Sequence, residues 1–170
     1  MRLDELAPKV MGLFEVESID QLGEEIMKSL DSEAKLSGFC DLVNNDLKRD
    51  WLQGVYQYYL ADREGKKQDF TPASLASLVV QLAGENASYT DMCAGTGRLA
   101  IEAWVKHPEA SFTLYELDAG VIPFLLFNLV VRNMESQVFE CDLLTGKTER
   151  SWMIKRGDRF GKCMPIEPAF

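Results

Sequence analysis

Apolar residues in the first 60 positions recur at intervals of three and four residues, which is the spacing of one face of an α-helix. The pattern runs through three stretches, at Leu13–Leu30, Leu36–Leu47 and Trp51–Tyr59. Asp50 immediately precedes the third stretch and is a suitable N-cap. The pattern predicts an N-terminal helical region over residues 1–64 that packs on the rest of the chain.

A short polar loop, residues 61–69, separates this region from a second part over residues 65–170. The second part opens with Phe70, Thr71 and Pro72, where Thr71 can cap a helix and Pro72 suits its first turn. Leu75, Leu78, Val79 and Leu82 lie on one side of this helix, which we expect to end near Gly84.

From Ser88 onward the pattern alternates between short strands and helices. Strands are predicted at 88–92, 112–117 and 137–143, and helices follow the first two, the second of them over 122–133. This order with short turns is typical of parallel strands in an open sheet. We therefore predict an α/β fold in which the helical region leads into a shortened Rossmann-like sheet, with a hairpin over residues 151–164.

One predicted helix is apolar on nearly all sides. Its residues 121–131 contain one amide, Asn128, among apolar side chains. Such a helix needs cover on two sides. The sheet supplies one cover, and either the N-terminal helices or a partner chain supplies the other; we favour the N-terminal helices.

Composition and charge narrow the function. Hydrophobic residues make up 46% and charged residues 26% of the 170, and 27 acids against 18 bases give a formal charge of −9. This is a globular composition without the basic face that a protein needs to grip duplex DNA unaided. Only the segment from Lys147 to Lys162 is basic. We expect it to be a solvated hairpin, with a phosphate contact as the alternative.

The cysteines and the apolar stretches exclude other classes. Four widely spaced cysteines and a single histidine, His107, predict neither a zinc site nor a disulfide framework. The first ten residues lack the pattern of a secretion signal. The longest apolar stretch, residues 121–131, is shorter than the about 20 residues of a membrane span. We expect a soluble, cytoplasmic protein that does not enter a membrane.

Candidate chemistry gathers where the three predicted strands end. Asp91, Glu116 and Asp142 occupy those ends, and Gly95 and Gly97 form a turn after the first strand. Ligands bind at the carboxyl ends of the strands in an open parallel sheet. Glu116 follows Gly95 by 21 residues, the usual separation for a carboxylate that accepts hydrogen bonds from ribose hydroxyls.

The position of Asp91 favours one ribose ligand over another. A dinucleotide would bring a pyrophosphate, which a carboxylate just before the glycine turn repels. S-adenosylmethionine brings an ammonium and a sulfonium, which a carboxylate and backbone carbonyls can satisfy. Asp142 can then accept a hydrogen bond from the adenine amino group. We therefore prefer S-adenosylmethionine and keep a nicotinamide or other nucleotide as the alternative.

Four motifs in this order resemble the adenine-specific DNA methyltransferases of type I restriction-modification systems, the N-6 DNA methylase family. They are 50–56 with 65–72 (ending in Phe-Thr-Pro), 91–97 (Asp-Met-Cys-Ala-Gly-Thr-Gly), 114–118 (Leu-Tyr-Glu-Leu-Asp) and 141–144 (Cys-Asp-Leu-Leu), and the likeness covers roughly residues 50 to 145. The resemblance implies a methyltransferase fold that binds S-adenosylmethionine. It implies the following cofactor-binding residues: Phe70, Thr71, Pro72, Asp91, Met92, Cys93, Ala94, Gly95, Gly97, Glu116, Leu117, Asp142 and Leu143.

The chain departs from that family at the catalytic motif. The family's Asn-Pro-Pro-Phe/Tyr, which holds the target amine and stacks on the flipped base, does not occur in these 170 residues. Residues 167–170, Glu-Pro-Ala-Phe, have one proline and a carboxylate in place of the amide. We also expect the family's fourth and later strands and its target-recognition domain to be missing from these residues. We therefore assign no catalytic residue.

Two functions remain open. The first is an S-adenosylmethionine-binding protein that methylates DNA only when a partner subunit supplies the acceptor site. The second is a non-catalytic cofactor-binding or accessory module that pairs with another protein or with itself.

Overall fold

Residues 2–62, 64–65 and 70–168 are described by the computed structural model. The N-terminal part is helical, as predicted, and consists of α1 (Leu3–Phe14), a short 3-10 helix η1 (Ile19–Gln21), α2 (Leu22–Lys28), α3 (Glu33–Leu42) and α4 (Trp51–Tyr59). Side-chain caps begin three of these elements. Ser18, Ser32 and Asp50 each accept a hydrogen bond from a backbone N–H in the first turn that follows. The predicted cap at Asp50 is confirmed.

Five strands form one mixed sheet in the order β1-β2-β3-β4-β5. They are β1 (Ser88–Asp91), β2 (Ser111–Glu116), β3 (Ser136–Asp142), β4 (Lys147–Lys155) and β5 (Lys162–Ile166). The first three are parallel, as predicted, and α6 (Arg98–Lys106) and α7 (Ile122–Val131) connect them. The predicted hairpin is also present, but β4 pairs antiparallel with β3. The sheet is therefore mixed where the sequence predicted parallel strands followed by a separate hairpin.

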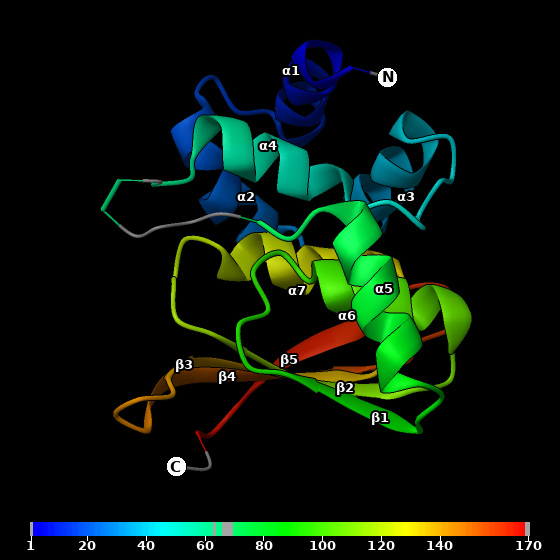
Figure 1. Ribbon diagram of the computed structural model, residues 1–170. Helices are drawn as coiled ribbons and strands as arrows, with labels where there is room; N and C mark the ends of the chain where they lie inside the picture. Colours follow the sequence, from blue (N-terminus) through cyan, green and yellow to red (C-terminus); the bar gives the residue numbers. More distant parts are fainter. Residues whose placement is uncertain (1, 63, 66–69, 169–170) are drawn as a thin grey trace.

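The described helices lie on one side of the sheet (Figure 1). α6 and α7 cover it directly, α5 (Ala73–Ala83) packs on α6, and the N-terminal helices stack over α7. Both crossovers from β1 to β3 put their helices on this side because parallel connections in one direction share one handedness. Because β1, β2 and β3 are parallel, their carboxyl ends lie at the same edge of the sheet.

α7 is the centre of the core. Nine of its ten residues are buried completely or nearly so, with Asn128 among them. The ring of Phe127 packs edge-on against Phe14 of α1 and Phe39 of α3, with ring centroids 5.4 and 5.1 Å apart. The sheet covers one side of α7 and the N-terminal helices cover the other (Figure 1). The prediction that the N-terminal helices supply the second cover is confirmed.

α5 differs from its prediction in two ways. Pro72, not Thr71, is the N-cap, and no side chain caps this helix. Pro72 takes this place because its extended backbone, with φ −62° and ψ 151°, lies outside the helix. The helix buries Ala76 and Val80, whereas its larger apolar residues are exposed: Leu75, Leu78, Val79 and Leu82.

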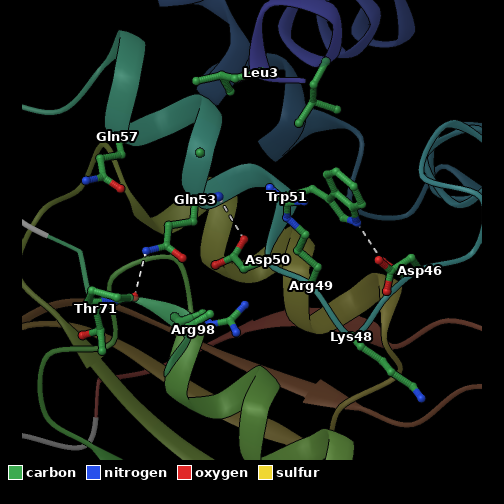
Figure 2. Close-up of a pocket in the computed structure, with 14 residues that line it drawn as sticks. Leu3, Asp46, Lys48, Arg49, Asp50, Trp51, Gln53, Gln57, Thr71 and Arg98 are labelled. Atoms are coloured by element: carbon green, nitrogen blue, oxygen red, sulfur yellow. Dashed lines mark hydrogen bonds between the residues drawn. The ribbon is translucent and has the colours of Figure 1, made fainter. Parts of the chain in front are cut away.

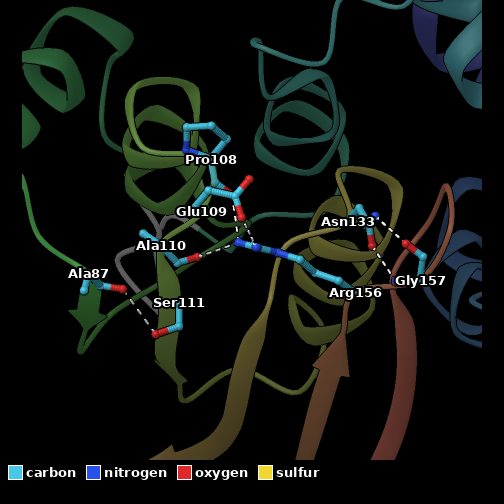
Figure 3. A network of polar contacts seen from close by, with 8 residues as sticks. All are labelled: Ala87, Pro108, Glu109, Ala110, Ser111, Asn133, Arg156 and Gly157. Atoms are coloured by element: carbon cyan, nitrogen blue, oxygen red, sulfur yellow. Dashed lines mark hydrogen bonds and ion pairs between the residues drawn. The ribbon is translucent and has the colours of Figure 1, made fainter.

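The turn between β4 and β5 is hydrogen-bonded to the segments that precede β2 and β3 (Figure 3). It therefore lies at the end of the sheet opposite the carboxyl ends of the parallel strands. Asn133 and the backbone of Gly157 exchange two hydrogen bonds, of 2.9 and 2.8 Å. Arg156 forms an ion pair with Glu109 and donates to the carbonyl oxygen of Pro108 at 2.9 Å. Arg156 is thus engaged by the protein, whereas the sequence predicted that the basic segment is solvated.

Candidate functional site

The glycine turn after β1 takes the predicted form. Gly95 and Gly97 have φ values of +54° and +95°, in the region that favours glycine. A Cβ atom on Gly97 would lie 2.9 Å from Cδ1 of Leu125, and one on Gly95 would lie 3.2 Å from Cε1 of Phe70. Both positions therefore need glycine, because the backbone has a positive φ and because a Cβ atom would crowd the neighbouring side chain. Phe70, although far from the loop in sequence, packs against it.

Asp91 ends β1 with an incompletely satisfied carboxylate. Its Oδ1 accepts a hydrogen bond of 3.1 Å from the backbone N–H of Cys93. Its Oδ2 is buried and has no hydrogen-bond partner among the described residues. Burial raises the pKa of Asp91 above its ordinary value. A buried carboxylate oxygen without a donor is costly, and a cationic ligand would relieve that cost.

Glu116 joins the end of β2 to the glycine loop. One carboxylate oxygen accepts from the N–H of Gly95 at 2.7 Å, and the other accepts from the N–H of Asp118 at 2.8 Å. Burial raises the pKa of Glu116 although these hydrogen bonds oppose the shift. Each carboxylate oxygen can accept more than one hydrogen bond, so the side chain keeps capacity for a ligand hydroxyl.

Asp142 ends β3 but makes its hydrogen bonds within its own turn. Its Oδ1 accepts from the N–H groups of Leu144 and Thr145, at 3.0 and 3.4 Å. The hydrogen bond from Leu144 lowers the pKa of this carboxyl group. The structure thus places Gly95 next to Phe70 and in hydrogen-bond contact with Glu116, whereas Asp142, at the end of the next strand, caps the turn to β4.

Each of the three acids is followed by an apolar side chain that is at least partly open to solvent. Met92, Leu117 and Leu143 are 65%, 68% and 42% exposed. Apolar groups next to carboxylates suit an organic cation with a planar ring better than a bare metal ion. In the described part of the chain, no group of three or more histidine, cysteine or acidic residues is placed to hold a metal.

The other predicted residues are divided between two places. Ala94 is buried inside the glycine loop, and Cys93 is exposed beside it. Thr71 and Pro72 line a separate cavity of about 590 Å³ between α4, the start of α5 and the first turn of α6 (Figure 2). Asp91, Glu116 and Asp142 do not line this cavity. Within the predicted Phe-Thr-Pro motif, Phe70 packs against the glycine loop, and Thr71 and Pro72 line the separate cavity.

The cavity is polar on one side. Arg98, the first residue of α6, reaches it with a side chain that is 11% exposed and pairs with Glu102 at 3.2 Å. The side-chain amide of Gln53 donates to the carbonyl oxygen of Thr71 at 3.2 Å (Figure 2). This contact joins α4 to the segment that carries Phe70.

An aromatic contact from the helical region to the site was not predicted from the sequence. The hydroxyl of Tyr56 on α4 donates to Asp118 at 3.3 Å, and its ring packs edge-on against Phe70 and Phe124, with centroids 5.8 and 5.1 Å apart. Tyr56 belongs to the motif at residues 50–56 that carries part of the resemblance. Its position in that motif is the feature of the sequence from which a role at the site could have been predicted.

A buried polar network beneath the loop was also missed. The hydroxyl of Thr96 donates to Asp50 at 2.6 Å, and the amide of Asn128 donates to the same carboxylate at 2.9 Å. Arg132 donates to the side-chain oxygen of Asn128 at 2.8 Å. Burial lowers the pKa of Arg132 to about 10, which leaves it charged near neutral pH. The amide within the apolar segment 121–131 was the sequence signal for this network.

Comparisons with protein-family models, with curated proteins and with solved structures find no match to this chain. Among the described residues, no helix has the length and apolar character needed to cross a membrane.

Proposed function

We propose that the edge formed by the carboxyl ends of β1, β2 and β3 binds S-adenosylmethionine. The observation that carries this proposal is the buried Oδ2 of Asp91, which lacks a donor among the described residues next to the glycine loop. An ammonium group supplies both a donor and the opposite charge. A pyrophosphate supplies neither, so Asp91 disfavours a dinucleotide at the same place.

The remaining groups suit the other parts of this ligand. Glu116 has acceptor capacity for ribose hydroxyls, and Leu117 and Leu143 offer partly exposed apolar surface for a purine ring. Asp142 is the proposed acceptor for the adenine amino group. Phe70 and the glycine loop would line the methionine end of the ligand.

Methyl transfer is the proposed use of the bound cofactor, with a partner subunit that contributes the acceptor site. In that reaction the target amine nitrogen attacks the methyl carbon, a nitrogen–carbon bond forms, and the carbon–sulfur bond breaks. Its electron pair stays on sulfur to give S-adenosylhomocysteine, and the amine proton passes to water. The groups that would hold a DNA base do not occur in these 170 residues, and we propose that a partner subunit supplies them. A non-catalytic cofactor-binding module is the second candidate, and the missing Asn-Pro-Pro-Phe/Tyr motif favours it.

Calorimetric titration of the purified protein with S-adenosylmethionine, S-adenosylhomocysteine and NADH tests the proposal. We expect saturable binding of the first two and none of NADH. The variant Asp91→Ala should abolish binding. Glu109→Gln, which changes an exposed acid at the opposite end of β2, should bind like the wild type. Binding of NADH alone, or binding that survives Asp91→Ala, would refute the proposed site.

A methyl-incorporation assay separates the two candidates. Purified protein is incubated with labelled cofactor and DNA, alone and with any protein that copurifies. Incorporation by the pair, lost in Asp91→Ala, supports the methyltransferase. Cofactor binding without incorporation under both conditions supports the module.

A further inference from the structure

Asp50 makes more contacts than a helix cap requires. Its Oδ1 accepts the capping hydrogen bond from the N–H of Gln53 at 2.9 Å, and its Oδ2 accepts from the hydroxyl of Thr96 at 2.6 Å. The other side-chain caps of the helical region, Ser18 and Ser32, are partly exposed serines with a single hydroxyl. Asp50 is 5% exposed, and its second oxygen is used by the glycine loop.

Thr96 is held at two points. Its hydroxyl donates to Asp50, and its carbonyl oxygen accepts from the amide of Asn128 at 2.9 Å. Both Thr96 and Asn128 are fully buried. The neighbours of Thr96 are the two glycines with positive φ, which have the most backbone freedom to lose on ordering. Thr96 is therefore fixed through both its side chain and its backbone, between two residues that are glycine.

The anchor is itself fixed to the core. Asn128 donates to Oδ1 of Asp50 at 2.9 Å. Arg132, one turn further along, donates to the carbonyl oxygens of Leu47 and Arg49 at 2.7 and 2.9 Å. The cation of Arg132 also offsets the buried charge of Asp50. Asn128 and Arg132 thus hold the 47–50 segment at both of its ends and set the position of the Asp50 carboxylate.

We infer that Asp50 is a positioning residue, which holds the glycine loop in its ligand-binding shape through Thr96 without touching the ligand. The inference rests on the proposed function, because the ligand is the one proposed for that loop. It gives the helical region a role at the site, where the sequence pattern predicted packing alone. A loop that is ordered before binding loses less entropy when the ligand arrives, so the anchor strengthens binding.

Matched variants separate anchoring from capping and from general stability. Thr96→Val keeps the shape of the side chain and removes the donor, whereas Thr96→Ser keeps the donor. Asp50→Ser keeps a good helix cap but is too short to reach Thr96. Val10→Ala removes apolar contacts in the buried core of α1, far from the loop in sequence, and serves as the control for stability.

Affinity for S-adenosylhomocysteine is measured by calorimetry well below the unfolding temperature of every variant, where loss of stability does not lower affinity. We expect Thr96→Val and Asp50→Ser each to weaken binding about tenfold or more, as is typical when a partner that orients a binding group is lost. Thr96→Ser and Val10→Ala should bind like the wild type. The double variant Asp50→Ser/Thr96→Val should be no weaker than either single variant, because both remove the same link.

Amide hydrogen exchange gives a readout that does not need the ligand. Exchange at Gly95 and Gly97 should quicken in Thr96→Val and Asp50→Ser but not in Val10→Ala. Wild-type affinity and wild-type exchange in Thr96→Val would overturn the inference. If the wild type does not bind S-adenosylhomocysteine, the proposed function is wrong, and the exchange data alone decide whether Asp50 holds the loop.

Discussion

The carboxylate of Glu116 accepts a hydrogen bond from the backbone N–H of Gly95 across 2.7 Å. The two residues are 21 positions apart: Glu116 ends β2, and Gly95 lies in the loop that follows the neighbouring parallel strand β1. The acid that was predicted to receive a ribose therefore also holds the glycine loop. One side chain serves the shape of the site and the proposed contact with the ligand.

This double role predicts the effect of Glu116→Gln. Glutamine keeps one acceptor oxygen but turns an NH₂ group toward either Gly95 or Asp118, so one backbone N–H loses its acceptor. We expect the binding free energy of S-adenosylhomocysteine to become less favourable by about 2 kcal/mol, which is typical of a hydrogen bond to a charged group. Calorimetry measures it, with Glu109→Gln as the control. Equal affinities in both variants would show that Glu116 is not a binding group.

The burial of Asp91 should make the ligand-free protein less stable near neutral pH. Burial raises the pKa of Asp91 above the ordinary 3.8, so the folded protein holds this proton more tightly than the unfolded chain does. The stabilising contribution of protonated Asp91 is therefore fully present below pH 3.8, its ordinary pKa. It is lost as the pH rises through the pKa of Asp91 in the folded protein. Asp91→Asn removes the charge, and we expect it to stabilise the ligand-free protein by about 1 kcal/mol near neutral pH.

The same variant should gain nothing in acid, where wild-type Asp91 is protonated. Urea unfolding at about pH 7 and about pH 3.5 measures both differences. Asp142→Asn is the control, because hydrogen bonds lower the pKa of Asp142 and the sign reverses: stability is lost as the pH falls. A stabilisation by Asp91→Asn that is the same at both pH values would contradict the assigned cause.

Gly97 and Gly146 offer a matched pair of glycines with positive φ. A Cβ on Gly97 would lie 2.9 Å from Leu125, whereas a Cβ on Gly146 would meet nothing within 4 Å. We expect Gly97→Ala to cost about 3 kcal/mol, from backbone strain and from the displaced core residue, and Gly146→Ala to cost about 1 kcal/mol from strain alone. Thermal unfolding measures both. Similar losses would mean that Leu125 moves aside freely.

Local patterns in the sequence predicted most of the fold. The predicted strands, 88–92, 112–117 and 137–143, differ by one residue at most at either end from those observed. Period and turn residues suffice for this because each strand is short and bounded by polar or glycine residues. The antiparallel pairing of β4 with β3 was not predicted, since hydrophobic period does not specify which strand a hairpin joins.

The site was predictable only in part, for a related reason. Glu116 and Asp91 were found because strand ends can be read locally and parallel strands end at one edge. The contact between Asp50 and Thr96 spans 46 residues, and that between Asp50 and Asn128 spans 78. The sequence identified Asp50 as a cap, which uses one of its oxygens. It gave no information on the partner of the other, because that depends on how α4 packs over the loop.

Among the cations in the described part of the chain, we expect the loss of Arg132 to lower the free energy of unfolding most. Its buried guanidinium donates to the carbonyl oxygens of Leu47, Arg49 and Asn128. Arg132→Met leaves these acceptors and the buried Asp50 without a counterpart, so we expect a loss of about 3–5 kcal/mol in the free energy of unfolding. Urea denaturation measures the loss.

Arg156→Met is the matched control for this variant. Arg156 also donates to backbone carbonyls and pairs with an acid, but Glu109 is 87% exposed (Figure 3). Because solvent can replace these contacts, we expect a cost of about 1 kcal/mol or less. If the two variants lose the same stability, burial is not what makes the Arg132 network important. A large loss at Arg132 alone would show that the helical region and the glycine loop depend on one buried charge.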